Sequence, residues 1–444
     1  GSSRFGPGRR FGDFAGGSVG WAFSEEEFFK NQISFINFAK LRASYGTVGN
    51  AELPSDFLWV SLANVNDSEI GYGGFNGVAY ERIGNNDLSW ETTKQFNLGF
   101  DLAMINNRVN VTFDVYNKLS ENLLLESRLA NSTGYLDRNF VFNVGSIRNT
   151  GVELSINTDN INKGDFRWTT GFNISRNRGI TESLTPPVNA DDNTIVSFTT
   201  GDVKLTEGGN FGTYFLPVWA GVDPTTGTEL IYEVDQVYLA ETGIARLTGG
   251  VLDAEELGGN INNHRMILED KTSLPDFFGG FNNSFSYKGL SLDVLFYFQY
   301  GNYILDQGER SQSYPGEQQS LRANMKEGLD LPEGQFSQNN PLLYNSNISG
   351  INTTRFLHDA SFIRLRNVQL SYTIPQVLTS KIGVSNLRVY ASGQNLLTFT
   401  KFDGWDPEVF NAGGDQQRAN AGPGSIGYNL PQVKTILLGV NIGF

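Results

Sequence analysis

Apolar and polar residues alternate along the last part of the chain. Five apolar residues share one face of an extended strand, namely Ile436, Leu438, Val440, Ile442 and Phe444. The opposite face receives Thr435, Gly439, Asn441 and Gly443. A two-residue period with one continuous apolar face is typical of a strand that crosses a lipid bilayer. Val440, Ile442 and Phe444 are therefore interpreted as a barrel-assembly signal.

The same period recurs upstream and predicts an antiparallel, all-β fold. About eleven segments carry it: Phe11–Ala22, Ala39–Gly46, Leu88–Met104, Arg108–Asn122, Asn139–Asn157, Asp165–Arg178, Asp276–Tyr287, Leu290–Gly301, Ser361–Ile374, Leu387–Thr398 and Val433–Phe444. Two hairpins are the clearest. Asn106 and Asn107 separate one pair of alternating segments, and Lys288 and Gly289 separate another; these residue types accept the positive φ angles that tight turns need.

The predicted connections alternate between short and long. The short ones are Ser24–Phe38, Ile105–Asn107, Asn160–Gly164, Lys288–Gly289 and Pro375–Asn386. The long ones are Thr47–Asp87, Leu123–Arg138, Gly179–Pro275, Asn302–Ala360 and Thr400–Gln432. Short turns at one end and long loops at the other are typical of an outer-membrane barrel, whose long loops face the cell exterior.

An odd number of strands cannot close such a barrel, because both ends of a bacterial single-chain barrel lie at the periplasmic side. An open sheet would also leave unpaired backbone groups facing hydrocarbon. We therefore expect the whole chain, residues 1–444, to form the C-terminal half of a barrel. About 22 strands are associated with transporters whose lumen is plugged, and no plug domain is recognised in this chain.

Composition and charge narrow the picture. The 444 residues include 51 Gly, 33 Phe and 17 Tyr, which favour strands and turns over helices. Cys is absent, so no disulfide or thiolate chemistry is expected. A net charge of −14 opposes nucleic-acid binding. Because the chain opens at Gly1 without a Met or a signal-peptide pattern, we interpret it as a processed or partial product.

Eight phrases along the chain resemble the SusC-like branch of the TonB-dependent outer-membrane transporters of Bacteroidetes. They follow the order of that family: Lys40–Asn50, Leu88–Lys94, Phe113–Lys118, Asn149–Glu153, Ala220–Gly227, Pro275–Gly280, Phe362–Val368 and Ala391–Leu397. The resemblance implies active import of an oligosaccharide or peptide across the outer membrane of a Gram-negative bacterium. It also implies a plug, a SusD-like surface lipoprotein and the TonB complex as partners, besides membrane lipid and the remaining N-terminal barrel.

Aromatic residues in the long loops or their stems are the best candidates for cargo contact, since flat rings pack against sugars and peptides alike. Six are singled out: Trp59, Tyr72, Tyr80, Trp219, Trp405 and Tyr428. The alternative is that these rings stack on each other or on a lid protein, or belong to the interfacial aromatic belt.

Enzymatic chemistry finds little support. Gly16 to Gly20 match the G-x-S-x-G string, but within a predicted strand rather than at a strand-to-helix turn, so no enzyme is expected. Two histidines without cysteine make a zinc site improbable. No cofactor is expected. Asp191–Asn193 and Asp223–Gly227 offer oxygen ligands for loop calcium, although Asx-type turns are the favoured explanation.

Two other kinds of protein remain open. One is a passive porin or small complete barrel of about twelve strands, with a missed strand such as Glu229–Leu239. The other is a soluble extracellular β-protein that binds glycans, which predicts polar residues on both faces of a sheet or an enclosed core.

Overall fold

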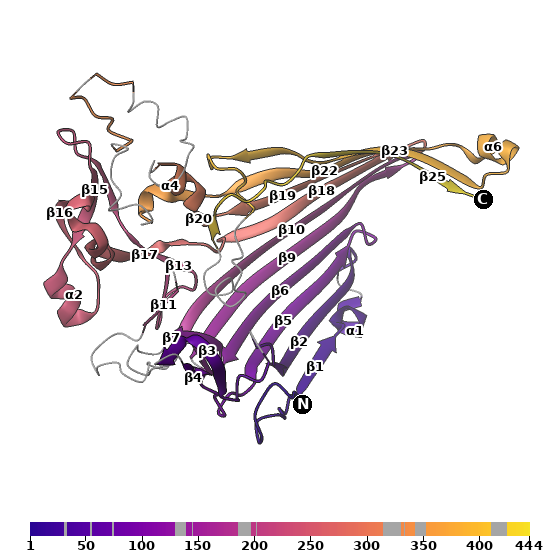
Figure 1. The fold of residues 1–444 in the computed structure, drawn as a ribbon. Helices are drawn as coiled ribbons and strands as arrows, with labels where there is room; N and C mark the ends of the chain where they lie inside the picture. The colour runs from indigo at the N-terminus through magenta and orange to yellow at the C-terminus, as the bar shows by residue number, and fades with distance from the viewer. Residues whose placement is uncertain are drawn as a thin grey trace.

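A computed structural model shows one large twisted antiparallel sheet with folded loops gathered at one of its ends (Figure 1). It describes residues 1–444 except 31–32, 54–55, 73–74, 129–138, 144, 185–196, 201, 314–329, 333, 342–351 and 410–423. Within the described part no helix has the length and apolarity needed to cross a membrane.

The main sheet contains eleven strands, each paired with its neighbours in chain order. They are β1 (Gly16–Trp21), β2 (Ile36–Asn50), β5 (Glu91–Met104), β6 (Val109–Glu121), β9 (Ser146–Lys163), β10 (Phe166–Ser183), β18 (Phe277–Tyr287), β19 (Leu290–Tyr300), β22 (Phe362–Thr373), β23 (Asn386–Thr400) and β25 (Thr435–Gly443). Each of the eleven predicted segments supplies one of these strands, so the predicted fold class is confirmed.

Two predicted segments begin too early. Phe11–Ala22 begins before β1, which spans Gly16–Trp21. Asn139–Asn157 is broken near Gly145, which has a φ of 65°, so β8 (Asn139–Asn143) leaves the sheet and pairs with β7 (Leu124–Arg128). Alternation alone could not detect the break, because both halves keep a period of two. The turns were predicted correctly: Asn106, Asn107, Lys288 and Gly289 all have positive φ angles.

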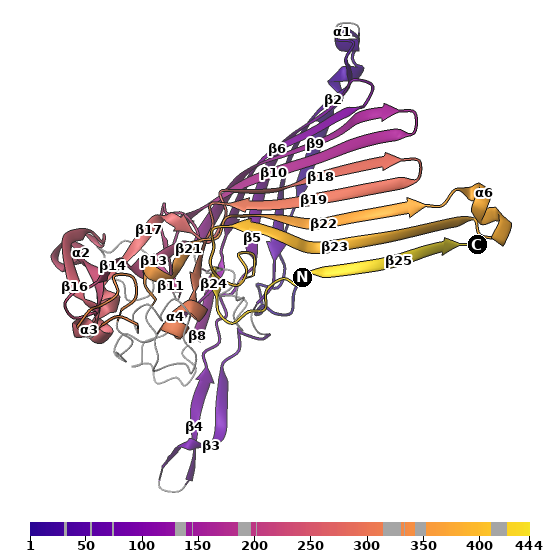
Figure 2. The same cartoon turned by 90° about the horizontal axis from the view of Figure 1, so that it is seen from above.

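Short turns and small helices occupy one end of the sheet, as the view from above shows (Figure 2). This turn end carries α1 (Glu27–Lys30) and α6 (Gln376–Thr379), with 3-10 turns at Phe23–Glu25 and Ser380–Ile382. The other end, the loop end, carries the remaining elements. The β3–β4 hairpin (Leu62–Tyr72 and Phe75–Arg82) projects away from the sheet there.

The other loop-end elements form three small sheets. They are β11 (Ser197–Thr200), β12 (Val203–Thr206), β13 (Thr213–Pro217) and β17 (Arg265–Thr272); β14 (Trp219–Val222), β15 (Glu229–Val234) and β16 (Leu247–Asp253); and β20 (Tyr303–Asp306), β21 (Leu357–Asp359) and β24 (Ser425–Ile426). Among them lie α2 (Gln236–Thr242), α3 (Ala254–Leu257), α4 (Gln307–Ser313) and 3-10 turns at Gly258–His264 and Thr354–Phe356.

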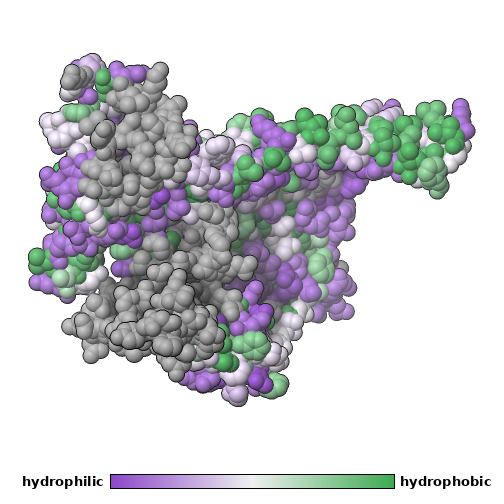
Figure 3. All heavy atoms as spheres, viewed as in Figure 1, coloured by the Kyte–Doolittle hydropathy of each residue, from purple (hydrophilic) through white to green (hydrophobic). Residues whose placement is uncertain are grey.

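The two faces of the main sheet differ in polarity. The outer face exposes large apolar side chains; Ile436 and Leu438 are 76% and 82% exposed, and Figure 3 shows hydrophobic residues along the arm that β23 and β25 form. The inner face carries ion pairs. Arg42 contacts Asp101 at 2.7 Å and Asp114 at 3.1 Å, crossing Gly99, where a Cβ would lie 2.6 Å from the guanidinium carbon.

Candidate functional site

Three long connections of the chain fold against one another at the loop end. Segments 184–276, 301–361 and 401–434 are called the loop module here. A buried apolar cluster joins the first two: Val203, Tyr214, Leu216, Ile231, Ala254, Ile261, Leu305 and Phe356. A second cluster joins the last two, and it contains Ile304, Ala360, Phe402 and Ile426. Burial of these side chains removes apolar surface from water, which stabilises a fixed arrangement of the loops.

Tyr214 connects all three segments of the loop module. Its side chain is 2% exposed, and its hydroxyl lies 2.9 Å from the Tyr303 carbonyl oxygen and 2.7 Å from that of Gly424. The Leu305 N–H also donates to the Gly424 carbonyl at 2.8 Å. Burial raises the pKa of the Tyr214 hydroxyl, so the group stays a neutral donor. Backbone carbonyls far apart in sequence thereby share one buried hydroxyl.

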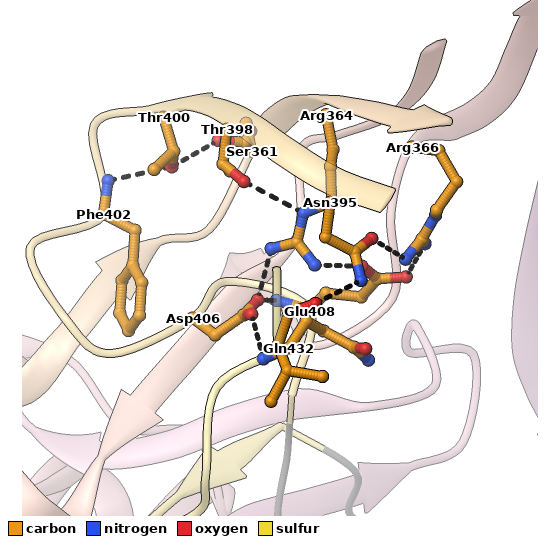
Figure 4. A network of polar contacts seen from close by, with 11 residues as sticks. Ser361, Arg364, Arg366, Asn395, Thr398, Thr400, Phe402, Asp406, Glu408 and Gln432 are labelled. Atoms are coloured by element: carbon orange, nitrogen blue, oxygen red, sulfur yellow. Dashed lines mark hydrogen bonds and ion pairs between the residues drawn. The ribbon is translucent and has the colours of Figure 1, made fainter. Parts of the chain in front are cut away.

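A network of charged side chains ties the loop module to the wall (Figure 4). The Arg364 guanidinium of β22 donates to Asp406 Oδ1 at 2.5 Å, to Glu408 Oε2 at 2.7 Å and to Thr398 Oγ1 at 3.0 Å. Arg366 contacts the other oxygen of Glu408. The Arg364 and Asp406 side chains are only 2% and 5% exposed. Such burial of opposite charges is tolerated because each carries several hydrogen bonds.

Asp406 also secures the far end of its own loop. Its second carboxylate oxygen accepts from the Gln432 N–H at 2.9 Å. Near the start of the loop, Thr400 donates to the Ser361 carbonyl at 2.8 Å and accepts from the Phe402 N–H at 3.0 Å. Segment 401–434 is therefore anchored at both of its ends to the inner face of the wall.

Asp202 and His264 are among the titratable groups of the loop module whose pKa values are shifted. Burial raises the pKa of the Asp202 carboxyl, although it accepts a 2.7 Å hydrogen bond from Asn352 and lies 3.9 Å from Arg265. Burial lowers the pKa of His264, an effect that outweighs the nearby Glu233 carboxylate. His264 Nδ1 accepts from the Val234 N–H at 3.1 Å, so the neutral ring carries its hydrogen on Nε2.

The structure places the six predicted aromatic residues on several different elements. Trp59 is half-buried with Arg10 over its ring at 6.0 Å, and Trp219 is half-buried with Arg355 over its ring at 5.8 Å. Tyr72 and Tyr80 lie in β3 and β4, but their side chains fall outside the described part. Two are mostly exposed, Trp405 at 60% and Tyr428 at 56%. The prediction of cargo contact stays open for all six.

Trp405 borders a cleft of about 240 Å³. Its lining comes from the end of β20, from α4 and from the start of segment 401–434: Asp306, Glu309, Gln312, Asp403, Gly404 and Trp405. Glu309 Oε2 lies 2.5 Å from His358 Nε2, while Asp306 accepts from the Glu309 N–H at 2.7 Å. Polar acceptors beside an exposed indole ring suit a hydroxyl- or amide-bearing ligand. Sequence reasoning missed Asp306, Glu309 and Gln312 because they lie far from Trp405 along the chain.

One of the two candidate calcium motifs has the hydrogen bonds of an Asx-type turn, the explanation that the sequence favours. Asp223 Oδ1 accepts from the N–H and hydroxyl of Thr225, at 2.7 and 2.5 Å, and from the Thr226 N–H at 3.2 Å. These hydrogen bonds lower the pKa of Asp223, and the geometry is that of an Asx-type turn. The other motif, Asp191–Asn193, lies outside the described residues. Ser18 of the G-x-S-x-G string lies within β1 and pairs with Ser44.

The three C-terminal residues that were interpreted as a barrel-assembly signal are exposed. Val440 and Ile442 of β25 are 57% and 53% exposed, and Phe444 is 94% exposed. Their outward direction agrees with the predicted face, whereas their role in assembly stays a prediction.

Comparisons with known proteins agree with this architecture. A family model described as "TonB dependent receptor-like, beta-barrel" matches residues 4–396. TonB-dependent receptor P3 of Formosa agariphila is 31% identical over 466 residues, and TonB-dependent receptor SusC of Bacteroides thetaiotaomicron is 26% identical over 453. A chain in the structure of the RagAB peptide transporter superposes with a TM-score of 0.79 at 25% identity.

Each match covers this chain completely and the relative only in part: 43% of receptor P3, 41% of SusC and 44% of the RagAB chain. The chain therefore spans less than half the length of these relatives. The resemblance drawn from the eight sequence phrases is confirmed, and the relatives are receptors and transporters rather than enzymes. With nearly the whole wall inside the family match, the chain belongs to the TonB-dependent receptor-like β-barrel family.

Proposed function

We propose that this chain forms part of the wall and mouth of an outer-membrane importer of the SusC type. Its sheet would face lipid with the apolar side and a polar lumen with the side that carries Arg42, Asp101 and Asp114. The observation that carries the proposal is this polarity, found on a sheet of the TonB-dependent receptor family. A membrane barrel alternates lipid-facing and lumen-facing residues in this way.

The rest of the protein would complete the wall. Strands β1 and β25 are the two edges of the described sheet, and each has one neighbour. Unpaired strand edges are costly in hydrocarbon, so we infer that further strands pair with them in a barrel of about 22 strands around a plug. The relatives, which are more than twice as long, have room for these parts.

The cargo would enter through the loop module. We infer an oligosaccharide or a peptide, handed over by a SusD-like surface lipoprotein and imported with energy from the TonB complex. Two similar proteins support this inference by their names: the TonB-dependent receptor SusC and the RagAB peptide transporter. Trp405 and Tyr428 present their rings on segment 401–434, which the Arg364 network holds against the wall; a fixed support limits the entropy lost when cargo binds.

The test uses the full-length transporter in its own host. Trp405→Ala with Tyr428→Ala should lower uptake of labelled peptides or oligosaccharides about tenfold, the value of one or two lost aromatic contacts. Tyr300→Ala is the control, because Tyr300 is similarly exposed, at 54%, but lies on the outer face of the wall. Deletion of TonB should abolish uptake in every strain. Uptake that survives without TonB would refute active import.

The structure gives less support to the two alternatives, a passive porin and a soluble glycan-binding protein. The missed strand of a twelve-stranded porin would have been Glu229–Leu239, but β15 belongs to a separate sheet with β14 and β16, and α2 follows it. A soluble glycan-binding protein has no reason to expose the apolar row of β25. Recovery of the protein from washed membranes without detergent would favour the soluble alternative.

A further inference from the structure

Five polar side chains interrupt the apolar outer face near the turn end of the wall. They come from β9, β10 and β18 and are named the outer polar cluster: Thr158, Asn160, Trp168, Thr170 and Asn283. The register aligns Thr158 with Thr170 and Thr170 with Asn283. The next outer-face row toward the loop end is apolar, with Phe172 paired to Ile156 and to Phe281. The row toward the turns pairs Trp168 with Phe285.

Hydrogen bonds join the five side chains into one chain. Thr158 donates to Asn160 Oδ1 at 2.8 Å, and Asn160 Nδ2 donates to Thr170 Oγ1 at 2.7 Å. Thr170 in turn donates to Asn283 Oδ1 at 2.8 Å, and Trp168 Nε1 donates to the same oxygen at 3.0 Å. A β-bulge between Trp168 and Thr169 lets the unpaired Asn160 reach across.

The cluster satisfies its acceptors and retains donors. Asn283 uses Oδ1 twice, and its amide nitrogen makes no hydrogen bond within the described residues. Asn160 uses one of the two N–H groups of its amide. A side-chain amide carries two N–H donors, so three remain. Donors without acceptors are costly beside hydrocarbon, and the cluster therefore needs a partner that offers oxygen atoms.

A cation lies beside these donors, at the turn between β5 and β6. Arg108 donates from Nε to the Asp159 carbonyl at 2.9 Å and from Nη2 to the Asn160 carbonyl. The residue is exposed, and no carboxylate in the described part of the chain lies within ion-pair distance of it. Its remaining guanidinium N–H groups suit a phosphate, which arginine binds with two parallel hydrogen bonds.

The depth of the cluster matches the interface of a bilayer. Asn283 precedes Tyr287, the last residue of β18, by four positions, which is about 10 Å along the membrane normal for a tilted strand. Trp168 and Phe285 stack there at 5.7 Å, as interfacial aromatic residues do. Going inward from the turns, a glycerophospholipid presents its phosphate and then its ester carbonyls, and both groups are acceptors.

We propose that the outer polar cluster and Arg108 bind the headgroup end of one phospholipid in the leaflet at the turn end. The Arg108 guanidinium pairs with the phosphate, and the free amide N–H groups of Asn160 and Asn283 donate to ester carbonyls. Complementarity of donors and acceptors favours a lipid over a second copy of the wall, whose own cluster would present the same donors. This site rests on the membrane placement proposed above, but not on the transport activity.

The test is native mass spectrometry of the full-length transporter after detergent extraction and exchange into nanodiscs that contain phosphatidylethanolamine. The wild type should retain one phospholipid. Asn283→Leu and Arg108→Gln should each lower its retention roughly tenfold, as expected for the loss of hydrogen bonds to a charged or desolvated group. Asn282→Leu and Arg167→Gln are matched controls, since Asn282 faces inward and Arg167 already contacts Asp159 at 3.5 Å; both should retain the lipid.

Ester and ether lipids separate the two contacts. A dialkyl-ether phosphatidylethanolamine keeps the phosphate but lacks the carbonyls, so it should be held about as weakly by the wild type as the ester lipid is held by Asn283→Leu. Equal retention by Asn283→Leu and the wild type would overturn the proposal. A disulfide-linked dimer of Asn283→Cys, a clean probe in a chain without cysteine, would overturn it in favour of a second copy. Normal uptake by Asn283→Leu with loss of the lipid would separate this site from the transport function.

Discussion

Replacing Arg364 by Met tests whether the buried charge network holds segment 401–434 to the wall. The methionine side chain is similar in length, so the change removes the guanidinium while it fills part of the volume. Asp406 and Glu408 then lose contacts of 2.5 and 2.7 Å. Because Asp406 is 5% exposed, water does not replace the lost partner while the loop stays docked.

The expected cost follows from burial. Breaking a buried ion pair by removing one partner costs about 3–5 kcal/mol, since an uncompensated charge remains. Arg366→Met is the matched control, because the Arg366 side chain is 29% exposed and its partner Glu408 is 20% exposed; solvent limits that cost to about 1 kcal/mol. Arg364→Met combined with Asp406→Asn should cost less than Arg364→Met alone, because the stranded charge is gone.

Hydrogen exchange of the full-length transporter measures the effect locally. A loss of about 3–5 kcal/mol in loop docking accelerates exchange in segments 401–409 and 424–434 by roughly two to four orders of magnitude. Amides of β23 and β25 should keep their protection, since ladder hydrogen bonds hold the wall. Equal exchange in Arg364→Met and Arg366→Met, or loss of protection throughout the wall, would refute the anchoring role of Arg364.

Three further predictions concern the wall and the loop module. Val294→Arg should cost about 2–4 kcal/mol on folding into lipid vesicles, and Asp293→Ala much less; equal costs would mean the facing is wrong by one residue. Tyr214→Phe should lower the unfolding free energy of the loop module, measured by hydrogen exchange, by about 1–3 kcal/mol. His264 has a lowered pKa in the folded state, so its contribution to stability is present above about pH 6.5 and declines as the pH falls below it. Protection factors in β15, which are corrected for the intrinsic exchange rate, should therefore fall in acid, whereas His264→Gln should remove that pH dependence.

The wall could be predicted from sequence because its constraint is local. A membrane strand presents apolar residues to lipid at every second position. The alternation of β19 and β25 can therefore be recognised without knowledge of the strands they pair with. The positive φ angles of Asn107 and Lys288 could likewise be predicted, because both residues stand in short turns between alternating segments. The prediction ended where alternation no longer separates wall from loop: β10 runs to Ser183, beyond the predicted end at Arg178.

The loop module could not be predicted, because its contacts join residues far apart in the chain. Tyr214 donates a hydrogen bond to Gly424, and Arg364 donates one to Asp406. Neither contact can be predicted from the alternation of apolar and polar residues. Arg364 could have been noticed as a cation on the inner face of β22, but the sequence does not predict that it contacts Asp406. Of the six aromatic candidates, composition could not separate Trp219, which packs beneath Arg355, from Trp405, which is exposed.

The same contrast separates the part of the chain that can vary from the part that cannot. Substitutions in the loop module change a surface that is folded on itself, with its own buried clusters, and leave the strand ladder intact. They are constrained in those buried clusters and where the module meets the wall, at positions such as Arg364 and Asp406. A loop carrying Trp405 can therefore vary at its exposed ring without losing its support, whereas loss of the support would release every ring on that loop together.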